Sequence, residues 1–281
     1  MDRLEAHRHF YADLITTSAG AGKNDRLKDA FASTPRERFV GTGPWKVFAG
    51  GNYLQTPTDD PAFLYQDVVV ALAPERRINN GQPVLHAINL TALDVKQGEK
   101  VLHVGAGTGY YTAVLARLTG KIGAVVAYEV EQDLAEKAAQ NLSDISHVTV
   151  QHRSGSEAPL PKCDAIYVNA GATAPLKVWL DALNVKGRLL FPLTPADGPG
   201  GMPGAGAMLL VTSTGANRFD ARFVCPAMFV PCLGARDEET AQKLSAAFAR
   251  GDFRNVKSLR RNSHPDETCW CAGDDWWISN V

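Results

Sequence analysis

Short apolar runs alternate with stretches of helical periodicity through the middle of the chain. Six runs have the length and apolar content of buried strands: residues 100–104, 124–129, 148–150, 163–168, 188–192 and 208–211. Apolar residues recur at helical spacing before the first run (83–93) and between later ones (111–118 and 132–142). Strands that alternate with helices predict a doubly wound α/β fold, with a mostly parallel sheet covered on both faces.

The two ends of the chain differ from this middle. Asp25 is placed to cap a short helix, and the apolar run 64–72 suits either a strand or a helix. The Gly- and Pro-rich residues 196–204 predict a flexible loop, and residues 238–250 predict an amphipathic helix. We therefore expect an N-terminal helical and irregular cap region at 1–81, a sheet domain at 82–234 and a C-terminal extension at 235–281.

The clearest chemical signal is a glycine turn between a predicted strand and a predicted helix. Gly105, Gly107 and Gly109 form a GxGxG pattern, whereas dinucleotide sites use GxGxxG to make room for a pyrophosphate. The next strand ends in Glu129, whose carboxylate can accept hydrogen bonds from both hydroxyls of a ribose. A tight turn and a solvated Glu are the alternative, but the two features together favour a nucleoside ligand.

Several segments resemble one enzyme family. The turn and the acid resemble the class I S-adenosylmethionine-dependent methyltransferases and, more narrowly, the protein-L-isoaspartate O-methyltransferases. The narrower resemblance rests on five segments: residues 25–40, the pair Tyr65 and Asp67, the pair Gly81 and Gln82, residues 109–116, and residues 229–234, which are similar to the last strand of the family. It covers roughly residues 10–234 and implies methyl transfer from S-adenosylmethionine to an oxygen, most simply a carboxylate.

The glycine turn, the acid, the carboxyl edge of the predicted sheet and the resemblance together indicate which residues act. The cofactor-binding residues would be Gly105, Ala106, Gly107, Gly109, Glu129, Ser154 and Asn169. In the loop 76–86, the amides of Asn80 and Gln82 can donate to an acceptor carboxylate, and these two are the candidate catalytic residues. A plain turn at Asn79–Gly81, and another after the strand 163–168, are the alternative interpretations.

Three positions depart from the family pattern. Leu85 stands where the family has a serine that is implicated in the active site. His103 replaces an acid in the first motif strand, and Arg153-Ser154-Gly155 replaces Gly-Asp-Gly. The acceptor can therefore differ from isoaspartate, for example an ordinary aspartate of a peptide.

Composition and charge narrow the picture further. The formal net charge of −1 gives no field that would steer the protein to nucleic acid, and no apolar segment is long enough to cross a membrane. The first residues lack the apolar core of a signal peptide, so we expect a cytoplasmic protein. Cys269, Cys271 and His264 lack the further ligand that a zinc site needs, so we predict no metal. The three tryptophans near the end are expected to anchor the tail on the body.

Three functional hypotheses follow from the sequence. The first is an O-methyltransferase that acts on a carboxylate of a protein or peptide. A carboxylate is already ionised near neutral pH, so the absence of an evident general base does not count against activity. The second is a methyltransferase that acts on a small molecule or RNA, and the third is a binding module that has lost the chemistry. The sequence does not determine the acceptor or the oligomeric state.

Overall fold

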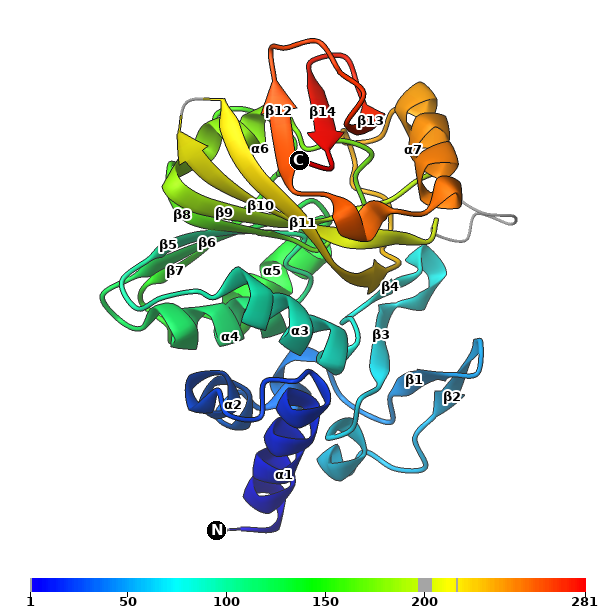
Figure 1. Cartoon of the computed structure of the whole chain (residues 1–281). Helices are drawn as coiled ribbons and strands as arrows, with labels where there is room; N and C mark the ends of the chain where they lie inside the picture. Colours follow the sequence, from blue (N-terminus) through cyan, green and yellow to red (C-terminus); the bar gives the residue numbers. More distant parts are fainter. Residues whose placement is uncertain (1, 197–203, 216) are drawn as a thin grey trace. The chain divides into compact units, whose positions relative to one another are not determined.

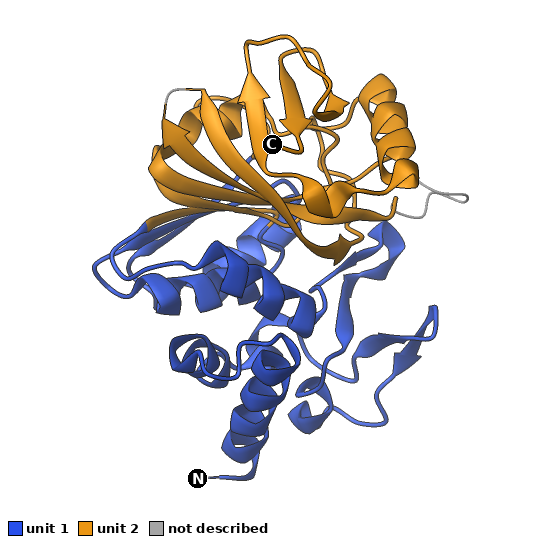
Figure 2. Ribbon diagram, in the orientation of Figure 1, with its two compact units in different colours: residues 1–99, 106–153 blue, residues 100–105, 154–281 orange. Residues whose placement is uncertain are grey.

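The computed structural model describes residues 2–196, 204–215 and 217–281. The chain divides into two compact units, which Figure 2 colours separately. Unit 1 comprises Met1–Glu99 and Ala106–Arg153, and unit 2 comprises Lys100–Gly105 and Ser154–Val281. Most of the loop expected at 196–204 lies outside the described residues. The division at residues 81 and 234 stays a prediction about the roles of the segments.

The α-helices in the described part of unit 1 carry the labels α1 to α5 in Figure 1. They are α1 (Arg3–Ser18), α2 (Asp25–Ala32), α3 (Pro83–Leu93), α4 (Tyr110–Thr119) and α5 (Gln132–Asn141), with the short 3-10 helices η1 (Arg36–Phe39), η2 (Pro61–Leu64) and η3 (Pro74–Arg76). Asn24, rather than Asp25, caps α2, because its side chain accepts a hydrogen bond from the Leu27 N–H while Asp25 is already helical. The buried face of α2 contains Leu27, Ala30 and Phe31, as its spacing predicts.

The strands in the described part of unit 1 fall into two groups. The strands β1 (Lys46–Ala49), β2 (Asn52–Gln55), β3 (Val69–Ala73) and β4 (Ile78–Asn79) form a sheet in the order β2-β1-β3-β4. The strands β6 (Ala124–Glu129) and β7 (Val148–His152) pair in parallel, with Glu129 opposite His152. The run 64–72 is thus divided between the end of η2 and most of β3, and the β1–β2 hairpin was not expected.

The strands in the described part of unit 2 range from four to 11 residues in length. They are β5 (Lys100–Val104), β8 (Cys163–Val168), β9 (Leu183–Leu193), β10 (Gly206–Gly215), β11 (Arg218–Ala227), β12 (Ser258–Arg261), β13 (Cys269–Ala272) and β14 (Trp276–Ser279). Within the unit they run in the order β13-β14-β12-β11-β10-β9-β8-β5. The pairs β5–β8 and β8–β9 are parallel, whereas every pairing from β9 to β13 is antiparallel. Among the described residues, its helices are α6 (Lys177–Ala182), α7 (Glu238–Arg250) and the 3-10 helix η5 (Phe253–Asn255).

The parallel strands and their connecting helices confirm the predicted α/β fold of Rossmann-like type. The residues that build it are those expected: the buried Val101, Leu102 and Val104 of β5, and the fully buried Ala165 and Ile166 of β8. Such continuous apolar strands are typical of a sheet that is covered on both faces. Within the described residues, no helix combines the length and the apolar character that crossing a bilayer requires.

The C-terminal segment docks on unit 2 by extending its sheet. β12 pairs with β11, and β14 pairs with β12, so the tail completes an edge that β11 would otherwise expose. The side chains of Trp270, Trp276 and Trp277 are 3%, 5% and 2% exposed, which confirms their expected anchoring role. The rings of Phe223 and Phe248 pack against Trp270 with centroids 5.2 and 5.1 Å away, joining β11, α7 and β13 into one aromatic cluster.

One expected strand is absent. Residues 229–234 resemble the last strand of the family, but β11 ends at Ala227 and the segment makes only an isolated bridge between Pro231 and Gly171. Pro231 has no N–H to donate to a ladder. The neighbouring backbone groups instead bond to Gly171, whose N–H donates to the Val230 carbonyl at 2.7 Å. The segment therefore braces the turn after β8 rather than lengthening the sheet.

Candidate active site

The glycine turn of unit 1 connects to the start of α4. Gly107 and Gly109 have φ angles of +56° and +97°, a backbone region that residues with a Cβ rarely adopt. A Cβ at Gly109 would lie 2.8 Å from Leu142 Cδ1, so packing as well as backbone angle requires glycine there. The Ala106 N–H donates to the Tyr128 carbonyl at 3.2 Å, which ties the turn to the end of β6.

The Glu129 carboxylate contacts the backbone of this turn. One carboxylate oxygen, Oε2, accepts from the Gly107 N–H at 2.6 Å, and the other accepts from the N–H groups of Val130 and Glu131 at 2.8 and 3.0 Å. Burial raises the pKa of Glu129, and the three backbone donors oppose that rise. A carboxylate oxygen can accept two hydrogen bonds, so Oε2 keeps capacity for one further donor. The residue expected to bind a ribose therefore already supports the turn.

Thr108 was not singled out from the sequence, although it lies inside the motif. Its hydroxyl donates to the carbonyl of Phe39, and its own carbonyl accepts from Asn141 Nδ2 at 2.9 Å. Thr108 is 6% exposed, so these bonds form in a largely dry environment. The turn is thus held at its centre by η1 and α5.

The predicted acceptor loop is anchored by Asp67. The carboxylate of Asp67 accepts from Gln82 Nε2 and from the Val84 N–H, both at 2.8 Å. Gln82 is the N-cap residue of α3, but its side chain makes no capping hydrogen bond to the helix. Asp67 instead accepts from the Val84 N–H, one of the N–H groups that have no partner within the helix. Asn80 lies beside β3, where its Oδ1 accepts from the Val70 N–H at 2.8 Å while its buried Nδ2 has no hydrogen-bond partner. The amide of Asn80 therefore keeps an unused donor.

Arg36 holds the segment that carries Asp67. Its side chain is fully buried and donates to the carbonyls of Leu64, Gln66 and Val68, the last two at 3.0 and 2.9 Å. The guanidinium also lies 5.5 and 5.8 Å from the ring centroids of Tyr11 and Tyr110. The sequence places Arg36 in a family-like segment, but only the structure reveals that its partners are three backbone carbonyls.

Unit 2 contributes the remaining predicted residues. Gly105 follows β5 with φ +75°, and a Cβ there would lie 3.6 Å from Asn169 Cβ. Asn169 follows β8, and its Nδ2 lies 2.8 Å from His103 Nε2 while its buried Oδ1 has no partner. Ser154 accepts from the Ser156 N–H at 3.2 Å and lies within hydrogen-bond distance of the Ser156 hydroxyl. The side chain of Asn169 thus keeps an unused acceptor, whereas the contacts of Ser154 are local.

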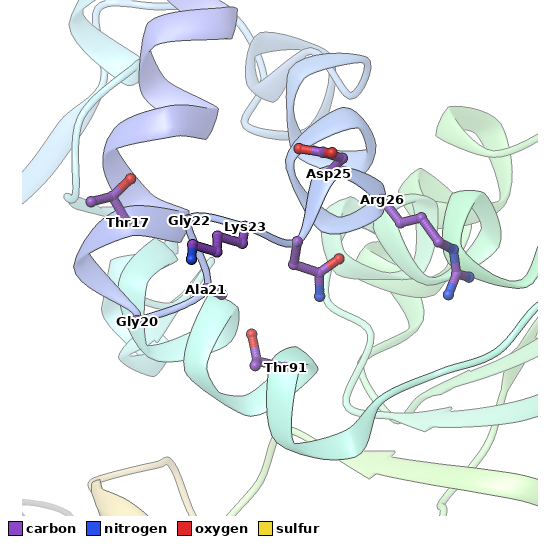
Figure 3. A pocket seen from close by; sticks show the side chains of 9 residues that line it. Thr17, Gly20, Ala21, Gly22, Lys23, Asp25, Arg26 and Thr91 are labelled. Carbon is purple, nitrogen blue, oxygen red and sulfur yellow. The ribbon is translucent and has the colours of Figure 1, made fainter.

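A separate cavity of about 770 Å³ lies beside the end of α1 and the start of α2 (Figure 3). It is lined by residues 20–26 together with Thr17 and Thr91. None of the predicted site residues lines it, and the Arg26 guanidinium already donates to the Leu118 carbonyl at 2.6 Å. We assign no chemistry to this cavity.

The parallel strands, the glycine turn before α4 and the acid that ends β6 define a Rossmann-like S-adenosylmethionine-dependent methyltransferase. The family model of protein-L-isoaspartate(D-aspartate) O-methyltransferase matches residues 11–232. The chain belongs to this family, and the expectation of a methyltransferase enzyme is confirmed. The small-molecule and non-enzyme hypotheses are not favoured.

Individual relatives agree with the family match. A protein-L-isoaspartate O-methyltransferase of Brucella anthropi is 30% identical over 219 residues, covering 74% of this chain and 86% of the relative. One of Methylorubrum populi is 33% identical over 211 residues with the same two coverages.

Solved structures share the fold. One protein-L-isoaspartate O-methyltransferase has a TM-score of 0.66 at 20% identity, covering 96% of this chain and 87% of that one. A Plasmodium falciparum chain, named as a protein-L-isoaspartate O-methyltransferase and solved with S-adenosyl-L-homocysteine, has a TM-score of 0.62 at 18% identity. It covers 80% of this chain, and this chain covers 97% of it.

Proposed function

We propose that this enzyme transfers a methyl group from S-adenosylmethionine to the free carboxylate of isoaspartyl residues in proteins or peptides. The observation that carries the proposal is the glycine turn closed by Glu129, in a chain whose residues 11–232 match the family. Bound S-adenosylmethionine supplies a methyl group that is already activated by its sulfonium. The acceptor carboxylate is ionised near neutral pH, so the protein has to align the reactants and exclude water.

The described residues fit such a cofactor. In unit 1, the turn Ala106, Gly107 and Gly109 presents bare backbone, and Glu129 Oε2 retains capacity to accept from a ribose hydroxyl. In unit 2, Asn169 offers an unpartnered Oδ1, Gly105 packs against Asn169, and Ser154 is proposed on its place in the sequence alone. These seven residues form the proposed cofactor set.

Asn80 and Gln82 form the proposed acceptor set, with different roles. Asn80 Nδ2 is the buried donor that we assign to the acceptor carboxylate. Gln82 is exposed and donates to Asp67, so its amide oxygen remains to accept from the peptide backbone of the substrate. Leu85, half-buried on α3, supplies an apolar surface where the family has a serine, so neither amide relies on a hydroxyl there.

The test uses one peptide in two forms, with either an isoaspartyl or an ordinary aspartyl residue at the same position. Labelled S-adenosylmethionine is supplied, and base-labile methyl incorporation is measured for the wild type, Asn80→Leu and a matched exposed control, Asn52→Leu. We expect incorporation only with the isoaspartyl form, at least about 10-fold lower for Asn80→Leu because a buried donor is lost, and unchanged for Asn52→Leu. Equal methylation of both peptides would identify a general aspartate methyltransferase instead. No incorporation despite cofactor binding would overturn the proposed acceptor.

A further inference from the structure

His103 occupies an unusual environment for an ionisable side chain. It lies in β5, is completely buried, and stacks on Tyr167 with ring centroids 5.6 Å apart and planes 12° apart. Burial lowers the pKa of His103 to about 3, so the ring is neutral at physiological pH. A neutral imidazole has one nitrogen that donates and one that accepts. The sequence position that carries an acid in the resembled family therefore carries no charge in this chain.

The contact between His103 and Asn169 fixes which nitrogen accepts. Asn169 Nδ2 lies 2.8 Å from His103 Nε2, and an amide nitrogen can only donate. Nε2 is thus the acceptor and the ring proton is on Nδ1. The tautomer and the rotation of the Asn169 amide are therefore coupled, because turning the amide over in this tautomer would place Oδ1 against the lone pair of Nε2.

This rotation directs Asn169 Oδ1 away from His103, and that oxygen is buried without a hydrogen-bond partner. Leaving a buried acceptor unpaired costs roughly 1–3 kcal/mol, so such atoms in folded proteins call for an explanation. The backbone of Asn169 is already fixed, because its N–H donates to the Val104 carbonyl at 2.8 Å. Gly105 packs directly on Asn169, where a Cβ would lie 3.4 Å from the Asn169 carbonyl carbon. The backbone of Asn169 is thus held by Val104 and packed by Gly105, its Nδ2 contacts His103, and its Oδ1 is unsatisfied.

We infer that His103 is a positioning residue that orients Asn169 so that its Oδ1 accepts from the α-ammonium group of the cofactor. The inference rests on the proposed function, since it requires S-adenosylmethionine as ligand. An ammonium group has three N–H donors and no acceptor, which matches a lone amide oxygen. The side-chain pair thus selects cofactors that carry a free amino group.

The first test determines the tautomer. Nitrogen-15 NMR of the histidine side chains, with His103 assigned through His103→Gln, is recorded between pH 5 and 8 with and without S-adenosylhomocysteine. We expect the Nδ1–H tautomer without protonation across this range, because the ring is buried. An Nε2–H tautomer would overturn the inference, since Asn169 would then present its NH₂ group, a donor suited to a carboxylate.

The second test isolates the contact with the amino group. Calorimetry compares S-adenosylhomocysteine with an analogue that lacks the α-amino group, for the wild type, Asn169→Leu and His103→Leu. We expect the wild type to prefer the amine by about 10-fold, the size of a hydrogen bond to a charged group. Asn169→Leu should lose the preference, His103→Leu should lose most of it, and His103→Gln, which still offers an acceptor, should restore it.

A matched control is Asn184→Leu, which removes another amide of unit 2, one that donates to Asp164 at 2.7 Å. It should keep the full preference for the amine. An undiminished preference in folded Asn169→Leu would refute the inference and leave the proposed function intact. Failure of the wild type to bind S-adenosylhomocysteine at all would instead refute the proposed function.

Discussion

The substitution Glu129→Gln removes the negative charge of this side chain and keeps its shape, so it tests what the charge contributes. The amide oxygen of Gln can replace Oε1 and keep the bonds from Val130 and Glu131. The NH₂ group then faces the Gly107 N–H, donor against donor, where the wild type has a 2.6 Å bond. Losing one bond to a charged acceptor and stranding its donor costs about 1.5–3 kcal/mol. Relief of the buried charge offsets part of that cost, so we expect a net loss of about 1–2 kcal/mol in unfolding free energy at pH 7.

The pH dependence of the unfolding free energy provides a second, independent prediction for Glu129→Gln. Because burial raises the pKa of Glu129 in the folded state, protonation favours the folded protein. The contribution of Glu129 is fully present below its unfolded pKa and is lost as pH rises through the raised folded value. Acidification from pH 7 should therefore widen the stability gap between wild type and Glu129→Gln. Cofactor affinity should move the other way, because a protonated carboxyl accepts more weakly from ribose hydroxyls.

The assays are urea unfolding and calorimetric titration with S-adenosylhomocysteine, each at several pH values between 5 and 8. We expect Glu129→Gln to bind about 10-fold more weakly at pH 8 and to show a flatter pH profile than the wild type. Glu136→Gln, an exposed acid on α5, is the control and should match the wild type in both assays. Identical pH profiles for wild type and Glu129→Gln would refute the assignment of the titrating group.

Three further outcomes follow from the contacts described. Asp67→Ala should lower the unfolding free energy by about 0.5–2 kcal/mol, because α3 loses its cap. It should also raise the KM for the isoaspartyl peptide and leave the affinity for S-adenosylhomocysteine unchanged. A parallel loss of cofactor affinity would show that Asp67 does more than anchor the acceptor loop. Gly81→Ala should destabilise the protein by roughly 1–3 kcal/mol, measured by urea unfolding, because its φ is +73° and a Cβ would lie 2.2 Å from His86 Nε2; wild-type stability would show that His86 can move aside. Trp277→Ala should cost about 3–5 kcal/mol by the same measurement, since its side chain is 2% exposed and donates to the Ser263 hydroxyl at 3.0 Å; a change in peptide KM at unchanged stability would indicate that the tail recognises substrate.

The sequence predicted those parts of the fold that depend on local periodicity. The limits of β5, β6, β8 and α7 agree with their predicted ranges, because each is a continuous apolar run or an amphipathic stretch bounded by turn residues. β11 was missed although a signal exists, since exposed Arg218 and Asp220 alternate with buried Phe219 and Ala221. The strands β12 to β14 have only four residues each, and their pairing with β11 is a tertiary effect that short segments do not encode.

The site was predicted unevenly for a related reason. Glycines in a turn and an acid at the end of a strand form a local sequence pattern. Gly107, Gly109 and Glu129 could therefore be predicted as site residues from the sequence. Thr108 and Arg36 act through backbone carbonyls that lie 69 and 28–32 residues away in the chain. Every residue type has a backbone carbonyl, so the sequence does not indicate which residues accept hydrogen bonds from Thr108 and Arg36.

These long-range contacts change how the N-terminal region should be understood. Phe39 holds the centre of the glycine turn through Thr108, and Arg36 holds the segment from which Asp67 caps α3. Both the proposed cofactor turn and the proposed acceptor loop of unit 1 are thus fixed by residues between 36 and 67. Since the acceptor carboxylate needs no general base, alignment is the main contribution left to the protein. We therefore propose that residues 36–67 serve the reaction by holding these two segments in position, without touching the reacting atoms.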